Sequence, residues 1–186
     1  MNSMKHDIIK RPNYFFLTEP QSCPYINSKV EQKLIVELQG DGVKDTHQNL
    51  AQHGFRRSHS IAYLPVCPTC KACKPVRVIA DQFTATRKSQ KRLCNKYGKL
   101  RVRMVSATAS RELYNLFFRY QSIRHSNSDM ADMGYYEFSS MLEESPIDTC
   151  LFEFRSKTDE LVGAVITDVT NDGMSAVYSF FSPDKI

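Results

Sequence analysis

Along residues 100–181 the spacing of apolar residues changes from that of a strand to that of a helix and back to that of strands. This succession constrains the fold more than any other feature of the sequence. The segment LRVRMV (100–105) alternates apolar and polar residues, which predicts a strand. The segment 110–126 has helical spacing instead and predicts the strongest helix of the chain. The broad apolar face of this helix holds Leu113, Leu116, Phe117, Tyr120 and Ile123.

A second helix and three further strands are predicted after this point. Residues 135–146 form a shorter amphipathic helix that ends at Pro146. Its inward positions are Phe138, Met141 and Leu142. The segments 149–155, 161–169 and 174–181 are predicted to be strands, and TNDG (170–173) is predicted to join the last two as a hairpin. Strand, helix, helix and three antiparallel strands is the front half of an acetyltransferase-like (GNAT) fold, so we expect an α/β (α+β) class with an incomplete GNAT-like region.

The first third of the chain predicts small strands around a cysteine-bearing turn. Residues 29–38 alternate apolar and polar side chains, which predicts a strand. Residues 45–54 indicate a short helix that begins at Asp45 or Thr46 and ends at Gly54. Short β-like runs at 58–65 and 75–80 lie on either side of the cysteine loop.

Composition excludes some classes of protein. At 186 residues the chain can bury a core without disulfides, and no apolar run approaches the roughly 18 residues of a membrane span. The N-terminal segment has scattered charges and does not resemble a secretory signal, so we expect a cytoplasmic protein. In a reducing compartment the six cysteines are thiols or metal ligands rather than disulfides.

Positive charge is concentrated in one segment. From Gln82 to Arg111 there is no Asp or Glu, while nine Lys or Arg residues fall there. Such a stretch is either a solvated helix face or a surface that binds a polyanion, and the absence of counter-charge favours the polyanion.

Three cysteines at three-residue spacing, Cys67, Cys70 and Cys73, form the loop CPTCKAC. Thiolates at this spacing can wrap around one metal centre. The alternatives are buried or redox-prone thiols and, less favoured, a catalytic thiol. Cys94 and Cys150 are expected to be structural.

Six short motifs occur in order along the chain. They are CPY (23–25), GFRRS (54–58), AYLPVCPTCKACKPVRV (62–78), RKSQKR (87–92), MADM (130–133) and YSFFSPD (178–184). Together they resemble the bacterial aspartate/glutamate leucyltransferases, which are relatives of the eukaryotic arginyl-tRNA–protein transferases. The resemblance implies an N-terminal region with the Cys loop at residues 1–84 and a GNAT-like catalytic region at 85–186.

The activity that the resemblance implies is transfer of an amino acid, leucine in the bacterial branch, from aminoacyl-tRNA to the N-terminal Asp or Glu of a protein. This marks the protein for degradation by the N-end rule pathway. The expected partners are aminoacyl-tRNA and proteins with an acidic N-terminus, with no membrane and no cofactor required for the transfer. The ester is already activated, and orienting it against an α-amine can supply ~7–11 kcal/mol of the barrier.

The candidate site residues come from the matched motifs and from the chemistry of the substrates, since a guanidinium binds a carboxylate through paired hydrogen bonds. The substrate-binding candidates are Arg56, Arg57, Tyr63, Arg77 and Arg124. The catalytic candidates are His125, Asp132 and Tyr178. The tRNA-binding candidates are Arg87, Lys88, Lys91, Arg92 and Lys96. The alternatives are an arginine that braces the fold, a surface histidine and tyrosines that only pack.

Cys23, in the CPY motif, is the expected fourth ligand beside the cysteine loop, for zinc or an iron–sulfur cluster. The eukaryotic relatives are associated with such a cluster, but they have an adjacent cysteine pair where this chain has CPTC. Family members also continue beyond the YSFFSPD motif, so the chain resembles a C-terminally truncated member. The alternative function is therefore a catalytically impaired RNA-binding or degron-binding module with a metal or cluster at its cysteines.

Overall fold

The computed structural model describes residues 13–185, and the chain forms two compact units, Met1–Lys74 and Pro75–Ile186. The division into family regions at residues 84 and 85 stays a prediction. The expectation about a secretory signal concerns mainly residues 1–12, which lie outside the described part.

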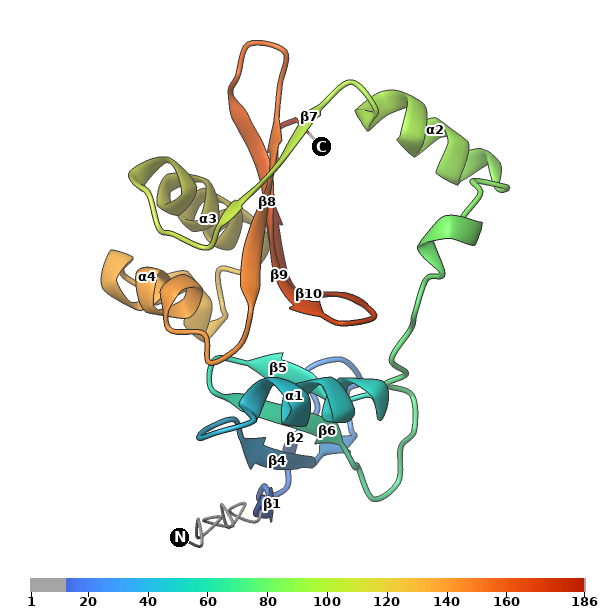
Figure 1. Ribbon diagram of the computed structural model, residues 1–186, viewed down its shortest axis with the longest axis vertical. Coiled ribbons are helices and arrows are strands. Elements are labelled where there is room, and N and C mark those ends of the chain that lie inside the picture. Colours follow the sequence, from blue (N-terminus) through green and yellow to red (C-terminus); the bar gives the residue numbers. More distant parts are fainter. Residues whose placement is uncertain (1–12, 186) are drawn as a thin grey trace, which may run out of the picture. The chain divides into compact units, whose positions relative to one another are not determined.

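The first unit consists of short antiparallel strands and one helix (Figure 1). Its elements are β1 (Phe15–Leu17), β2 (Gln21–Ser22), β3 (Val30–Glu31), β4 (Lys33–Glu37), α1 (Val43–Gln52), β5 (Arg56–Ser58) and β6 (Ile61–Pro65). One sheet has the strand order β1-β4-β6-β5, and β2 pairs with β3. The small core contains Val36, Leu38 and Ala62, against which Val43, Leu50 and Phe55 pack.

The strand and helix predicted in the first unit are confirmed with changed limits. The strand predicted at 29–38 is interrupted between β3 and β4. The helix predicted from Asp45 begins earlier, at Val43, because Gly42 takes a left-handed φ of 80° immediately before it. It ends at Gln52, and Gly54 with φ 88° turns the chain into β5.

The strand predicted at residues 75–80 is wrong. Residues 75–79 have no strand assignment, and Ala80–Gln82 forms the short 3-10 helix η1. The apolar side chain of Val76 is 83% exposed. A β-like run is stabilised only by a neighbouring strand or a buried face, and this run has neither among the described residues.

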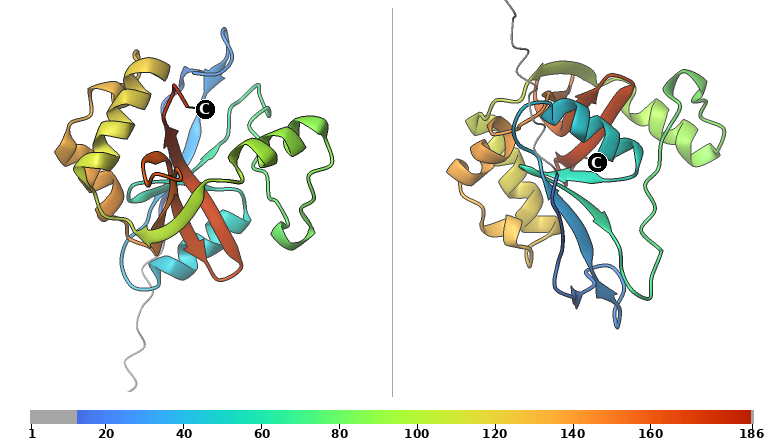
Figure 2. Two further views of the ribbon diagram at one scale, coloured as in Figure 1. Left: turned by 90° about the horizontal axis from the view of Figure 1, so that it is seen from above. Right: turned by 60° about the horizontal axis from the view of Figure 1, so that its bottom comes forward.

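The second unit is an antiparallel sheet with the strand order β10-β9-β8-β7 (Figures 1 and 2). After η1, its elements are α2 (Lys88–Tyr97), β7 (Arg101–Ser106), α3 (Arg111–Arg124), η2 (Asp129–Asp132), α4 (Tyr135–Glu143), β8 (Thr149–Arg155), β9 (Leu161–Thr170) and β10 (Gly173–Phe181). The predicted class and the predicted order of strand, two helices and three antiparallel strands are confirmed. The hairpin at TNDG is confirmed as well, with Gly173 opposite Thr170.

Helices α3 and α4 lie side by side over one face of this sheet (Figures 1 and 2). The core between them and the strands is mainly aromatic. Phe117 of α3 lies 4.9 Å from Phe138 of α4 and 5.5 Å from Phe180 of β10, measured between ring centroids. Leu151 and Ile166 from the central strands are fully buried beneath them. Ser110 caps the N-terminus of α3, and its hydroxyl accepts a hydrogen bond from the amide of Leu113.

The last turn of α3 differs from the sequence prediction. Ile123, predicted on the apolar face, is 55% exposed, whereas Gln121 is only 1% exposed. The buried stripe is Leu113, Phe117 and Gln121, at steps of four residues along the helix. A polar residue therefore occupies a core position, and its hydrogen bonds determine what it does there.

None of the helices in residues 13–185 combines the length and the apolar character needed to cross a bilayer.

Candidate functional site

The C-terminal end of α3 brings the three catalytic candidates onto neighbouring elements. Tyr178 lies on β10, half-buried, and its hydroxyl oxygen accepts a hydrogen bond of 2.7 Å from Nε2 of Gln121. The same Nε2 atom lies 4.0 Å from the sulfur of Met130, a residue of η2. Asp132 is the last residue of η2. The motifs YSFFSPD and MADM, distant in sequence, therefore meet at α3.

His125 caps this end of α3. Its Nε2 lies 3.2 Å from the hydroxyl of Tyr120, and the two ring centroids are 5.3 Å apart. The imidazole is exposed, so it is open to a substrate. Within residues 13–185, no hydrogen bond directly joins His125, Asp132 and Tyr178.

The environment of Tyr178 keeps its hydroxyl protonated. Burial raises the pKa of the phenol above its usual value of 10.0, the nearby Tyr120 raises it further, and the hydrogen bond from Gln121 lowers it in part. A neutral phenol at pH 7 is a hydrogen-bond donor and not a base. The arrangement can therefore stabilise a developing negative charge.

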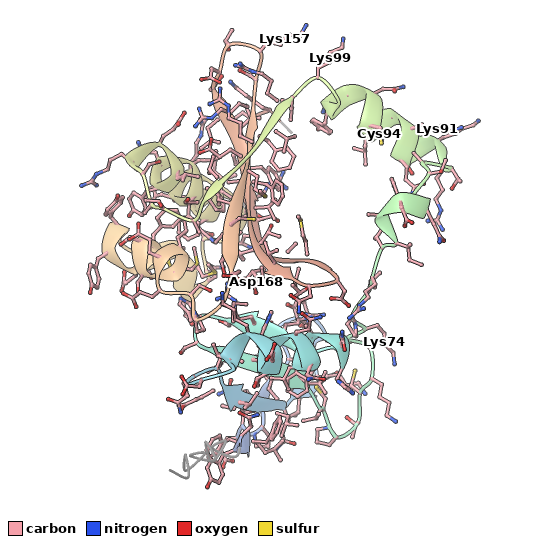
Figure 3. The ribbon with its side chains drawn as sticks, viewed as in Figure 1. Lys74, Lys91, Cys94, Lys99, Lys157 and Asp168 are labelled. Atoms are coloured by element: carbon pink, nitrogen blue, oxygen red, sulfur yellow. The ribbon has the colours of Figure 1, made fainter. Side chains whose placement is uncertain are left out.

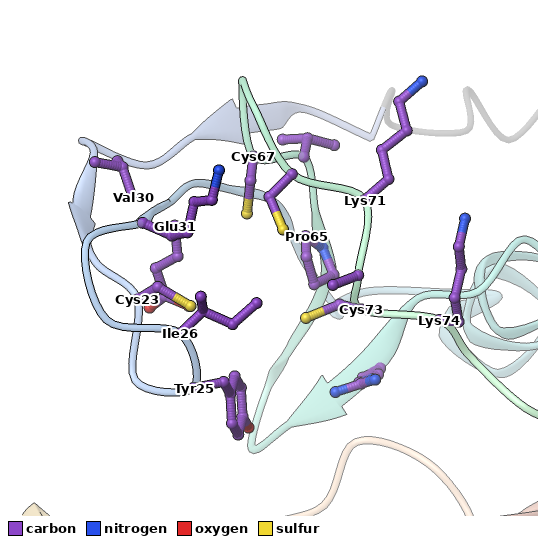
Figure 4. A pocket seen from close by; sticks show the side chains of 15 residues that line it. Cys23, Tyr25, Ile26, Val30, Glu31, Pro65, Cys67, Lys71, Cys73 and Lys74 are labelled. Atoms are coloured by element: carbon purple, nitrogen blue, oxygen red, sulfur yellow. The ribbon is translucent and has the colours of Figure 1, made fainter.

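The four predicted metal ligands line one pocket of about 790 Å³ in the first unit (Figure 4). Cys23, Cys67, Cys70 and Cys73 all line it. Figure 4 shows the sulfurs of Cys23, Cys67 and Cys73 turned towards the same space. The donor set therefore has the chemistry for zinc or a thiolate-bound cluster. Within residues 13–185, however, no group of three or more His, Cys, Asp or Glu side chains is close enough to hold an ion.

The same pocket is positively charged. Four cationic residues line it: Lys29, Arg56, Lys71 and Lys74. The acidic residue in the lining is Glu31, whose carboxylate is ion-paired with Lys33 at 2.8 Å. Pockets with this excess of cations attract carboxylates and phosphates.

The remaining substrate-binding candidates have different surroundings. Arg57, next to Arg56, is 7% exposed and donates from Nη1 to the carbonyl oxygen of His59 at 2.9 Å. Tyr63 of β6 pairs with Arg56 of β5, and the ammonium of Lys33 lies 5.8 Å from its ring centroid. Arg57 therefore braces β5, whereas Arg56 faces the pocket.

Arg77 and Arg124 belong to the second unit. Arg77 lies 3.7 Å from the carboxylate of Asp172 in the β9–β10 turn. Arg124, at the end of α3, has its guanidinium carbon 5.8 Å from the ring centroid of Phe181. Neither residue is among those that line the pocket of the first unit.

The tRNA-binding candidates lie on α2. No residue of this helix is buried, and Arg87 caps its N-terminus. Figure 3 shows Lys91 and Lys99 projecting away from the ribbon. Lys96 lies 4.9 Å from the ring centroid of Tyr97. Cys94 is exposed on this helix, so burial does not support the structural role expected for it.

An antiparallel sheet with two helices over one face is an α+β fold of the acyltransferase-like kind. Family models narrow this class. The N-terminal model described as arginine-tRNA-protein transferase matches residues 21–92, and the C-terminal model of the same description matches residues 112–185.

Similar proteins agree with the family models. The chain is 49% identical over 181 residues to the aspartate/glutamate leucyltransferase of Paramagnetospirillum magneticum, covering 97% of this chain and 74% of that protein. It is 46% identical over 174 residues to that of Rhodospirillum rubrum, covering 94% and 70%. The chain therefore belongs to the arginine-tRNA-protein transferase family, and its relatives are longer than it is. The resemblance inferred from the six motifs is confirmed.

Sequence reasoning missed several residues of these sites. Gln121 was overlooked because the apolar stripe was assigned to Ile123, although Gln121 continues the four-residue steps of Leu113 and Phe117. Lys29, Lys71 and Lys74 were overlooked as pocket residues because nothing in the sequence shows that the CPY turn and the cysteine loop share a pocket.

Proposed function

We propose that the chain is an aminoacyltransferase that moves leucine from leucyl-tRNA to the N-terminal Asp or Glu of a protein in the cytoplasm, marking it for degradation by the N-end rule pathway. The observation that carries the proposal is 49% identity, over 97% of the chain, to a protein named aspartate/glutamate leucyltransferase. Both the N-terminal and the C-terminal models of the transferase family match the chain, which supports transfer of an amino acid from tRNA to a protein.

The reaction is aminolysis of an ester. The neutral α-amine attacks the carbonyl carbon of the leucyl ester, the new C–N bond forms, and the C–O bond to the tRNA ribose breaks. One amine proton is lost and one proton is gained by the ribose oxygen, so the step is balanced without a redox partner. An α-amine with a pKa of about 7.7–8.0 has a useful neutral fraction at pH 7. Holding the amine and the ester in the right orientation then provides most of the lowering of the activation barrier.

The acceptor's acidic side chain is proposed to bind Arg56. This is supported by the exposed guanidinium of Arg56, which lines a pocket together with three lysines. A guanidinium can donate two parallel hydrogen bonds to one carboxylate. Arg57 is not equivalent, because it is buried and hydrogen-bonded to the backbone. Arg77, Arg124 and Tyr63 stay secondary candidates.

The donor tRNA is proposed to bind along α2. Arg87, Lys88, Lys91, Arg92 and Lys96 are all exposed on or beside this helix. The segment from Gln82 to Arg111 has no carboxylate that would repel phosphates. The binding energy is expected to be electrostatic and therefore to fall steeply with salt.

The chemical step is proposed to use Tyr178 as a hydrogen-bond donor and His125 as the base that takes the amine proton, with Asp132 as an orienting residue. The protonated state of Tyr178 supports a donor role towards the ester carbonyl, where negative charge develops. The exposed imidazole of His125, held by Tyr120, supports the base role.

The cysteine pocket is proposed to bind zinc or an iron–sulfur cluster through Cys23, Cys67, Cys70 and Cys73, which requires the loop 67–73 to close on Cys23. The shared pocket of the four thiols supports this proposal. Metal content of the purified chain tests it: Cys23→Ser should lose the metal and lower the melting temperature, whereas Cys94→Ser on the exposed helix should change neither. Equal metal content in both variants contradicts the assignment.

The experiment for the whole function uses labelled leucyl-tRNA and peptides that differ only in their first residue. We expect label on peptides beginning with Asp or Glu and none on a peptide beginning with Ala. Binding of tRNA without any transfer would favour the alternative, a binding module without catalysis. Transfer to the Ala peptide at the same rate would contradict acceptor selection.

A further inference from the structure

Gln121 is a polar side chain in a position built for an apolar one. It continues the buried stripe of Leu113 and Phe117 on α3 and is 1% exposed. A methionine of similar length would fill the same space without removing an amide from water. The amide makes a contact that an apolar side chain cannot make, the hydrogen bond to Tyr178.

That contact fixes the direction of the hydrogen bond at Tyr178. Nε2 of Gln121 carries only donors, so the Tyr178 oxygen 2.7 Å away has to accept. The second neighbour of Nε2, the Met130 sulfur at 4.0 Å, is also an acceptor, which supports this orientation of the amide. Because the phenolic oxygen accepts from Gln121, its own hydrogen is free to point elsewhere.

The oxygen atom of the Gln121 amide supports the hypothesis that this side chain has a functional role. Oε1 of Gln121 is buried and has no hydrogen-bond partner in the described part of the chain. An unsatisfied buried acceptor destabilises the fold, and such atoms persist where the group has another role. The amide is thus poorly suited to stability but well suited to orienting Tyr178.

We propose that Gln121 is a positioning residue for the transfer reaction: its Nε2 holds the Tyr178 oxygen as an acceptor, so that the Tyr178 hydroxyl donates its hydrogen to the carbonyl oxygen of the aminoacyl ester. This inference rests on the proposed function. Gln121 touches no substrate and acts through Tyr178.

The first test measures the ionisation of Tyr178 in the purified chain, by NMR of ring-labelled tyrosines with Tyr178→Phe for assignment. Donation from Gln121 stabilises the phenolate, so Gln121→Met should raise the pKa of Tyr178 further. Leu113→Met, a volume-conserving change on the same stripe, should leave it unchanged. Gln121→Met should also fold at least as stably as the wild type, because it removes the unpaired Oε1.

The second test measures transfer of leucine to an Asp peptide. Gln121→Met is expected to lower kcat about tenfold or more with little change in KM, as expected for a contact made only in the transition state. In a Tyr178→Phe background the same change should have no further effect. An unchanged Tyr178 pKa, or additive losses in the double variant, would overturn the inference while the proposed function stands. A wild-type chain that transfers nothing overturns the proposed function, and the positioning role of Gln121 with it.

Discussion

Arg155 shows how one side chain links two elements of the second unit. Its Nε donates to Glu153 on the same strand at 2.8 Å, and its Nη2 donates to Glu112 at the start of α3 at 2.7 Å. Its Nη1 also donates to the carbonyl oxygen of Asp159 in the β8–β9 turn. These contacts, the bond to Glu153 above all, raise the pKa of Arg155 far above its ordinary value, so it stays charged throughout the physiological range.

Replacing Arg155 tests the strength of this link. The side chains of Arg155 and Glu153 are 11% and 12% exposed, so Arg155→Met leaves Glu153 charged and largely desolvated. We expect the free energy of unfolding to fall by about 1–3 kcal/mol, measured by urea denaturation. Arg101→Met is the control, because Arg101 and its partner Asp159 are half exposed. In this variant the free energy of unfolding should fall by less than about 1 kcal/mol. Equal losses in the two variants would contradict this account.

The two cysteines outside the pocket should differ in reactivity. Burial, followed by the charge of Asp168, raises the pKa of the Cys150 thiol, so at any given pH less of it is thiolate. Cys94 is exposed on α2. In the folded chain at about pH 8, iodoacetamide should therefore modify Cys94 well before Cys150, as followed by mass spectrometry of peptides. Modification at equal rates would show that the β8 region opens readily.

The elements differ in how far the sequence predicts them. The strands β8, β9 and β10 and the helix α3 were predicted almost to their limits, because each has a long apolar pattern of one period and a buried face. The run at 75–80 has the composition of a strand but no partner, which only the folded structure reveals. The same limit applies to the sites. The pocket lined by Lys29, Lys71 and Lys74 and the hydrogen bond of Gln121 to Tyr178 both join segments that are distant in sequence.

Helix α2 is expected to be the least stable helix of the second unit. It has ten residues, none of them buried, and its like charges at Lys88, Arg92 and Lys96 repel at four-residue spacing. Helices of this length are marginal without packing, so its amides should exchange hydrogen within about tenfold of unstructured rates. Leucyl-tRNA should slow this exchange, since phosphates neutralise the repulsion, while exchange in β9 should not change. Strong protection of α2 without RNA would contradict this prediction.

At the scale of the whole molecule, a transferase of this kind has to bind two unlike substrates. One is a polyanion held by many weak contacts, and the other is a single acidic residue held by a few strong ones. The structure provides a feature suited to each, in separate units: the exposed cations of α2 in the second and the cationic pocket at Arg56 in the first. The two binding functions should therefore respond to different mutations.

Variants of Arg56 and Lys91 test this separation in the transfer assay. Arg56→Met should raise KM for an Asp peptide about tenfold, because the loss of one charge-assisted hydrogen bond weakens binding by about that factor. KM for leucyl-tRNA should not change. Lys91→Gln should weaken leucyl-tRNA binding and lower the slope of log Kd against log salt by about one, because one phosphate contact is lost. Lys157→Gln, in the exposed β8–β9 turn, removes the same charge elsewhere and should change neither (Figure 3). If Arg56→Met and Lys91→Gln both impaired both substrates equally, the two features would belong to one shared site, and the assignment of separate binding surfaces would be wrong.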